Sequence, residues 1–140
     1  MNMQVDSRGK VDGLTARCHC GGVSFILPTS RSGVVACHCT DCRTLHGNYN
    51  AMLAVPREAI VMLFDDTLAW YDSSENVRRG FCSKCGSRLF KDRHLADHVM
   101  VSAGSVIGPV GARIVENMFE ESKGDWYDLP RTRRDQLPTA

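Results

Sequence analysis

Cysteine is the residue whose number and spacing suggest chemistry in this sequence. There are seven cysteines, and they fall into three short motifs: Cys18-His19-Cys20, Cys37-His38-Cys39-Thr40-Asp41-Cys42 and Cys82-Ser83-Lys84-Cys85. An odd number of thiols cannot be consumed by a closed set of disulfides. Thiolates grouped at this spacing are zinc ligands, and their softness disfavours magnesium or calcium. The motifs therefore predict metal binding.

The first and last motifs each resemble half of a tetrahedral zinc site. Cys82 and Cys85 precede Gly86, which allows a tight turn whose backbone amides point at sulfur. Cys18 and Cys20 form a similar pair, also followed by glycine. Joining the two pairs predicts a closed four-thiolate zinc site that ties the start of the domain to its middle. An iron–sulfur cluster is the alternative, but two short pairs fit a single zinc more simply.

Cys37, Cys39 and Cys42 then remain, and three protein ligands are what a catalytic zinc uses, because its fourth position stays open. We therefore expect two zinc ions, one structural and one catalytic. An open zinc can bind a thiol and lower its pKa, so that the thiolate attacks an aldehyde carbon. The alternative is a site closed by a fourth side chain, which would make both metals structural. The candidates for that ligand are His19, His38 and His46.

Other side chains near the middle motif have more than one candidate role. His38 and His46 titrate in the range of a general base, but we expect both to face solvent, and no general base is identified. Asp41 is either a hydrogen-bond partner of the ligands or a turn residue. Arg43 is a candidate for binding a substrate carboxylate, with a plain surface arginine as the alternative. Trp126 either lines a substrate pocket or caps the core.

Composition limits the classes of function. The 140 residues suit one domain, with 43% hydrophobic and 24% charged residues. A net charge of +1 offers no field for nucleic acid or an anionic membrane, and no apolar run approaches the ~20 residues of a membrane span. The first ten residues lack the apolar segment of a secretory signal. We therefore expect a cytoplasmic protein, with thiols that stay free or bind metal.

The sequence predicts that short strands position these motifs. Apolar runs broken by Gly, Pro and Asp predict an all-β domain, with strands at 23–27, 51–55, 59–64, 68–71, 76–82, 87–91 and 98–106. Residues 111–121 fit a strand or a short helix, and we favour the strand. Residues 43–47 predict a helical turn that ends at Gly47. The expected domain is 15–130, with a lead-in at 1–14 and a tail at 131–140.

Five segments together resemble a known family: CHCGGVSFIL (18–27), CHCTDCRTLHG (37–47), VPREAI (55–60), RRGFCSKCGSRLF (78–90) and VSAGSV (101–106). Their order and separation are similar to those of the glutathione-dependent formaldehyde-activating enzymes, a family that includes centromere protein V-like proteins. The resemblance covers roughly Arg17 to Leu129.

That resemblance implies a mainly β, Mss4-like (β-tent) single domain with short antiparallel strands around two zinc ions. It implies that Cys18, Cys20, Cys82 and Cys85 hold the structural zinc and that Cys37, Cys39 and Cys42 hold the catalytic one. The implied activity joins glutathione to formaldehyde as S-hydroxymethylglutathione, a carbon–sulfur lyase reaction in reverse.

The sequence also departs from the family. Asn117 stands near the position where many relatives have a histidine, which bears on glutathione recognition, and the chain is shorter than the enzyme that names the family. Two other functions remain open. One is a non-catalytic, zinc-stabilised binding module on an Mss4-like scaffold. The other is a redox sensor in which Cys37, Cys39 and Cys42 cycle through disulfides.

Overall fold

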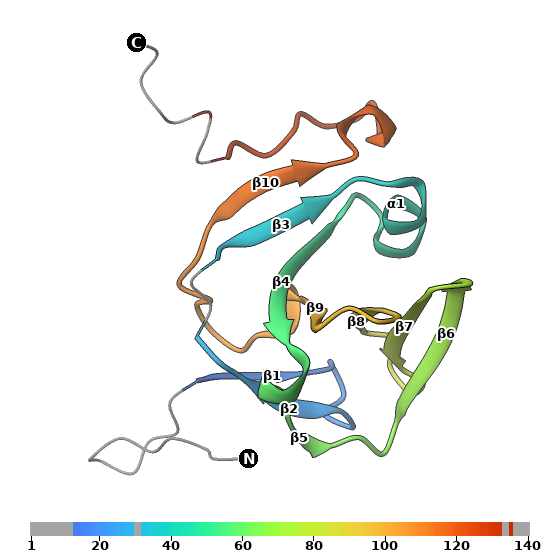
Figure 1. Ribbon diagram of the computed structural model, residues 1–140, viewed down its shortest axis with the longest axis vertical. Coiled ribbons are helices and arrows are strands. Elements are labelled where there is room, and N and C mark those ends of the chain that lie inside the picture. Colours follow the sequence, from blue (N-terminus) through green and yellow to red (C-terminus); the bar gives the residue numbers. More distant parts are fainter. Residues whose placement is uncertain (1–12, 30–31, 133–134, 136–140) are drawn as a thin grey trace.

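Short strands make up most of the computed structural model, which describes residues 13–29, 32–132 and 135 (Figure 1). The strands are β1 (Leu14–Arg17), β2 (Ser24–Leu27), β3 (Val34–Cys37), β4 (Asn50–Pro56), β5 (Val61–Phe64), β6 (Leu68–Ser74), β7 (Val77–Cys82), β8 (Arg88–Arg93), β9 (His98–Ser102) and β10 (Ile114–Met118). The helices of the described residues are α1 (Thr40–His46) and three short 3-10 helices, η1 (Arg57–Ala59), η2 (Ala103–Ser105) and η3 (Glu120–Ser122). The predicted mainly β domain is confirmed.

The strands form two sheets. β1, β2 and β5 make a three-stranded sheet, and the larger sheet has the order β10-β3-β4-β9-β8-β7-β6. Neighbouring strands run antiparallel, apart from β3 and β10, which are parallel. Figure 1 shows the larger sheet curving from β10 and β3 at the top to β6 at the right, with the smaller sheet below.

One core cluster joins the two sheets. Phe25 and Leu27 alternate with more exposed neighbours along β2, so the face of the small sheet that they share is apolar. Phe25 meets Phe90 of β8, with ring centroids 4.9 Å apart. Leu53 and Val101 extend the same cluster across β4 and β9. Burying each of these side chains contributes about 1.5–3 kcal/mol, so this contact holds the sheets together.

The segments at 59–64 and 68–71 both contain strands, but these strands do not pair with each other. β5 pairs with β2, whereas β6 pairs with β7. The turn at Asp65 and Asp66 therefore carries the chain from one sheet to the other. Residues 111–121 contain the favoured strand, β10. The helical turn after Cys42 belongs to α1, which ends at Gly47, whose φ of 92° is more accessible to glycine.

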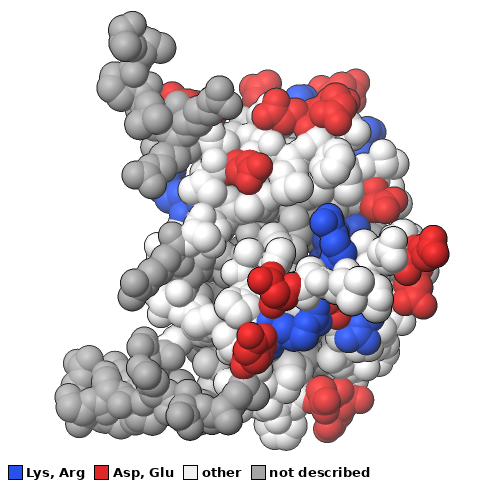
Figure 2. Space-filling view, in the orientation of Figure 1, with Lys and Arg blue, Asp and Glu red and all other residues white. Residues whose placement is uncertain are grey.

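The predicted lead-in at 1–14 and tail at 131–140 lie mostly outside the described residues. Among the helices of the described residues, none is both long and apolar enough to cross a membrane. Figure 2 shows acidic and basic side chains interspersed on one face of the molecule, as a net charge of +1 leads one to expect.

Candidate metal centres

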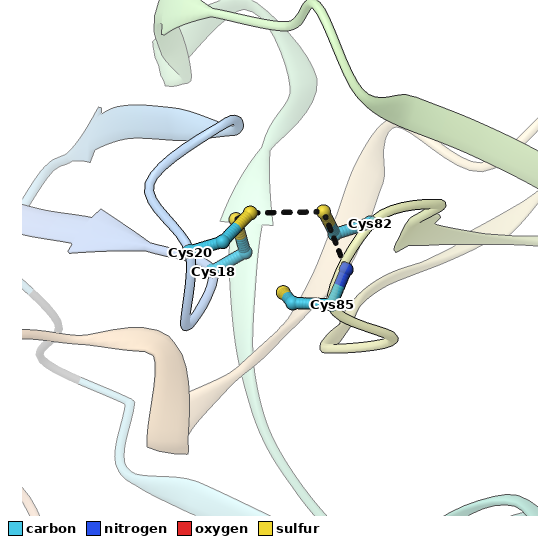
Figure 3. Close-up of side chains that lie close together, drawn as sticks. All are labelled: Cys18, Cys20, Cys82 and Cys85. Carbon is cyan, nitrogen blue, oxygen red and sulfur yellow. Dashed lines mark hydrogen bonds between the residues drawn. The ribbon is translucent and has the colours of Figure 1, made fainter.

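Two pairs of cysteines from different sheets meet in the first candidate centre (Figure 3). Cys18 and Cys20 follow β1, while Cys82 ends β7 and Cys85 lies in the turn before β8. All four sulfurs lie within 4.8 Å of one another, and Cys20 Sγ is 3.6 Å from both Cys18 Sγ and Cys82 Sγ. Four sulfurs at about 2.3 Å from a tetrahedral zinc are about 3.8 Å apart, so this cluster fits zinc. A metal bound here would link the small sheet to the large one.

Backbone and hydroxyl donors surround Cys18, Cys82 and Cys85, whereas at Cys20 a backbone bond from Gly22 is outweighed by burial and by the neighbouring thiols, which raise its pKa to about 11. The Val23 amide donates to Cys18 Sγ at 3.3 Å, and the Cys85 amide donates to Cys82 Sγ at 3.4 Å. Hydrogen bonds from Ser87 lower the pKa of Cys85 to about 5. Such donors stabilise negative charge on sulfur, which is the form that binds a metal.

The second candidate centre lies where β3 passes into α1. Cys37 is the last residue of β3, Cys39 caps the N-terminus of α1, and Cys42 lies in its first turn. Their sulfurs all lie within 4.8 Å of one another, a spacing that also suits zinc. Cys37 and Cys42 are fully buried and Cys39 is half-buried, so the cluster reaches the surface at Cys39. The Cys42 thiol donates to Cys37, which lowers the pKa of Cys37 and raises that of Cys42.

Within the described residues, no histidine, aspartate, glutamate or further cysteine joins these three sulfurs. The histidines considered as a fourth ligand lie elsewhere. His19 is exposed beside the first centre, and His46 is half-buried at the end of α1. Burial lowers the pKa of His46 to about 4, helped by the positive charges of Arg79, Arg88 and Lys91. His46 is therefore neutral at physiological pH.

The expectation that His38 faces solvent is wrong, because its side chain is fully buried. Its Nδ1 lies 2.6 Å from the Tyr127 hydroxyl, and its Nε2 lies 2.9 Å from Asn117 Oδ1. The Asn117 amide group donates to the Pro130 carbonyl, which leaves Oδ1 facing His38. His38 Nε2 therefore donates to Asn117, and Nδ1 accepts from Tyr127. The side chain between two of the clustered cysteines thus anchors the C-terminal segment rather than facing water.

Arg79 is a residue of this centre that our reading of the sequence did not identify. It lies in β7 and is only 4% exposed. Its Nη1 lies 3.7 Å from Cys42 Sγ, and its Nε donates to Ser73 Oγ at 3.1 Å. Three thiolates and one zinc ion would carry a net charge of −1, which Arg79 would balance. The sequence feature that could have identified Arg79 is the pair of arginines at 78 and 79. Successive residues of a strand face opposite sides of the sheet, so one of the two arginines points inwards.

The two residues proposed to bind substrate, Arg43 and Trp126, lie against each other. The Arg43 guanidinium carbon is 4.7 Å from the centroid of the Trp126 ring, a cation–π distance. Trp126 Nε1 donates to Asn48 Oδ1 at 2.7 Å, and the ring packs closely on Gly124. Trp126 is still 53% exposed. Asp41 is exposed in the first turn of α1.

Comparison with known proteins gives one family and one fold. The family model described as glutathione-dependent formaldehyde-activating enzyme matches residues 13–122. Among solved structures, a crystal structure of a Rhodobacter sphaeroides protein is similar, with a TM-score of 0.62 and 17% identity. The similarity covers 74% of this chain and 99% of that chain, and at this identity it shows the fold alone. No curated protein matches the chain.

Proposed function

The chain belongs to the glutathione-dependent formaldehyde-activating enzyme family, and from that premise we propose that it is a zinc enzyme that adds a thiol to an aldehyde. With glutathione and formaldehyde the product is S-hydroxymethylglutathione. A sulfur–carbon bond forms as the carbonyl double bond opens, and the thiol proton ends on the new hydroxyl oxygen. The reverse direction breaks the same bond and is a carbon–sulfur lyase reaction.

One observation carries the proposal: three cysteine sulfurs lie together without a fourth ligand among the described residues, and their edge at Cys39 reaches the surface. A zinc ion held by Cys37, Cys39 and Cys42 would lower the pKa of a thiol in its open position and polarise the aldehyde oxygen. The cluster of Cys18, Cys20, Cys82 and Cys85 would hold the structural zinc. All seven cysteines are free, which suits a reducing compartment such as the cytoplasm.

The neighbouring side chains support this chemistry by position and charge. Arg79 supplies a buried cation next to Cys42 and so stabilises the anionic cluster. His38 has both ring nitrogens engaged, so it is a positioning residue that holds the loop between Cys37 and Cys39. Asn117 is occupied by His38 and Pro130, so its side chain acts on the site through His38.

Arg43 and Trp126 are the proposed contacts for the substrate on the outer side of α1. Stacking on the exposed Trp126 ring holds the guanidinium in place while leaving it with no carboxylate partner among the described residues. A planar guanidinium suits a carboxylate, of which glutathione has two.

The test is to count metal ions and watch the three-cysteine centre. In Cys39→Ser one thiolate is lost, but serine is a favoured N-cap and should keep the start of α1. We expect about two zinc ions per chain in the wild type, about one in Cys39→Ser, and two in the control Thr40→Ala at the adjacent exposed position. In the cobalt-substituted wild type, glutathione should change the visible absorption bands of the second ion.

The rival function is a binding module in which both metals are structural. Two metal ions whose cobalt spectrum does not respond to glutathione or to any small thiol would favour that rival. Activity of the metal-free protein, together with reversible disulfide formation among Cys37, Cys39 and Cys42, would favour the redox sensor instead.

A further inference from the structure

A cavity of about 620 Å³ lies at the C-terminal end of α1 and has no role in the chemistry described so far. Its walls come from the C-terminal end of α1, the start of β4, the turn before β8, the end of β1 and the segment around η2. The volume is in the range of pockets that hold small molecules. Cys18 of the four-cysteine centre lies in one wall of the cavity, and His46 of α1 lies in another.

The lining of this cavity combines apolar side chains with cationic and hydroxyl-bearing ones. Among the described residues that line it, Arg17 and Arg88 carry charge, and none is an aspartate or a glutamate. Hydroxyl groups come from Tyr49 and from Ser87, Ser102 and Ser105. Within the described part of the chain, neither arginine forms an ion pair with a carboxylate. Arginines and hydroxyls without an acidic side chain in the described lining make this pocket complementary to an anion.

Arg88 is better placed than Arg17 to recognise a ligand. Arg88 begins β8, is half-buried, and its guanidinium carbon lies 5.4 Å from the centroid of the Phe81 ring. Arg17 is exposed at the rim. A guanidinium held by an aromatic ring loses less conformational entropy when it binds a carboxylate than a free one does.

The inner wall of the cavity adjoins the three-cysteine centre. His46 follows Cys42 by one helical turn, so both side chains lie on the same face of α1. Asn50, also in the wall, is the direct neighbour of Cys37 in the pairing of β3 and β4. A ligand whose sulfur reached the three-cysteine centre would therefore have this cavity next to it.

We propose that the cavity binds a carboxylate group of the thiol substrate, with Arg88 as the residue that recognises it. The ligand class is a small peptide-like thiol that carries a carboxylate, and glutathione belongs to this class. This inference rests on the proposed function, and it adds a specificity determinant on the side of α1 that faces β8. Glutathione has two carboxylates, and this proposal assigns one of them to Arg88.

The test uses S-methylglutathione, which keeps both carboxylates but has no free thiol. In the zinc-loaded wild type, we expect it to bind and to shift the amide NMR signals of residues 87–88 and 102–107. Arg88→Met should weaken this binding at least tenfold, and Arg88→Lys, which keeps the charge, should weaken it less. Arg93→Met is the matched control, since Arg93 is exposed in the same strand and does not line this cavity.

A neutral thiol, N-acetylcysteamine, separates the two proposals. Its effect on the cobalt spectrum should be the same in wild type and Arg88→Met. Shifts from S-methylglutathione that avoid this cavity, or binding that Arg88→Met leaves intact, would overturn the cavity assignment even if thiols still altered the metal spectrum. Loss of S-methylglutathione binding in Arg88→Met, with no thiol affecting the metal, would uphold the cavity and overturn the proposed function. The NMR map of the wild type decides the location without any variant.

Discussion

Replacing Arg79 by methionine should loosen the metal in the three-cysteine centre. Arg79 is 4% exposed, and its Nη1 lies 3.7 Å from Cys42 Sγ. A unit charge at that distance from another contributes about 4.5 kcal/mol at an effective dielectric constant of about 20. The negative charge is shared by three sulfurs, and two of them are not in contact with Arg79. We therefore expect Arg79 to contribute about 3 kcal/mol to the free energy of metal binding, so that its loss lowers metal affinity roughly 10²-fold.

The effect on the metal-free protein should have the opposite sign or vanish. Without a metal the thiols can protonate, and among the described residues the Arg79 side chain then has the Ser73 hydroxyl as its one hydrogen-bond partner besides sulfur. A buried cation without a countercharge is destabilising, so methionine at this position should leave the metal-free protein as stable as the wild type or make it more stable. The coupling between metal binding and stability is what identifies Arg79 as a charge partner rather than a packing residue.

The assay is competition for zinc with a chromophoric chelator, together with urea unfolding with and without metal. Arg78→Met is the matched control, because Arg78 is the adjacent arginine, points to the other side of β7 and pairs with Asp92 at 3.0 Å. We expect the control to hold its second zinc as the wild type does. Wild-type affinity for the second zinc in Arg79→Met, or equal losses in both variants, would refute the electrostatic argument.

Three further predictions concern the structural centre, the aromatic wall and pH. Cys85→Ser should lower the unfolding midpoint far more than Cys39→Ser does, because the four-cysteine cluster joins the two sheets and metal-binding energy there is folding energy; similar midpoints in thermal scans of the two variants would contradict this. Gly124→Ala places a methyl group against the Trp126 ring, so tryptophan fluorescence should shift and the KM for glutathione should rise at least threefold, with the melting temperature little changed. The pKa of His46 is lowered to about 4 in the folded protein, so the unfolded chain binds the extra proton between about pH 6.5 and 4, and stability falls as pH falls through that window. A pKa lowered from 6.5 to about 4 corresponds to at most about 3.4 kcal/mol, and solvent screening of this half-buried side chain reduces the figure to about 2 kcal/mol. His46→Gln should remove this part of the fall in urea titrations, whereas His94→Gln at an exposed position should retain it.

The sequence by itself determined the local features of this protein. Cysteines within six positions stay close together whatever the rest of the chain does, so the proximity of Cys37, Cys39 and Cys42 at the passage from β3 to α1 is a local property. Short β-rich runs ended by Pro, Gly or Asp are equally local, because strand propensity and turn chemistry act over a few residues. The cysteine motifs and their flanking segments also indicated the family, because their order along the chain is sufficient to recognise it.

Only the tertiary structure decided which distant groups share an environment. β5 and β6 are consecutive, yet they belong to different sheets, because pairing depends on which edge is available and not on strand propensity. Cys20 meets Cys82 across 62 positions and two sheets. His38 has a polar side chain and lies next to the start of α1, so the sequence predicts an exposed position. The fold instead buries it between Tyr127 and Asn117, which supply its hydrogen bonds. The charge of Arg79 is evident from the sequence, but its contact with the buried Cys42 thiol requires β7 and α1 to meet across 37 positions, a long-range arrangement that no local pattern encodes.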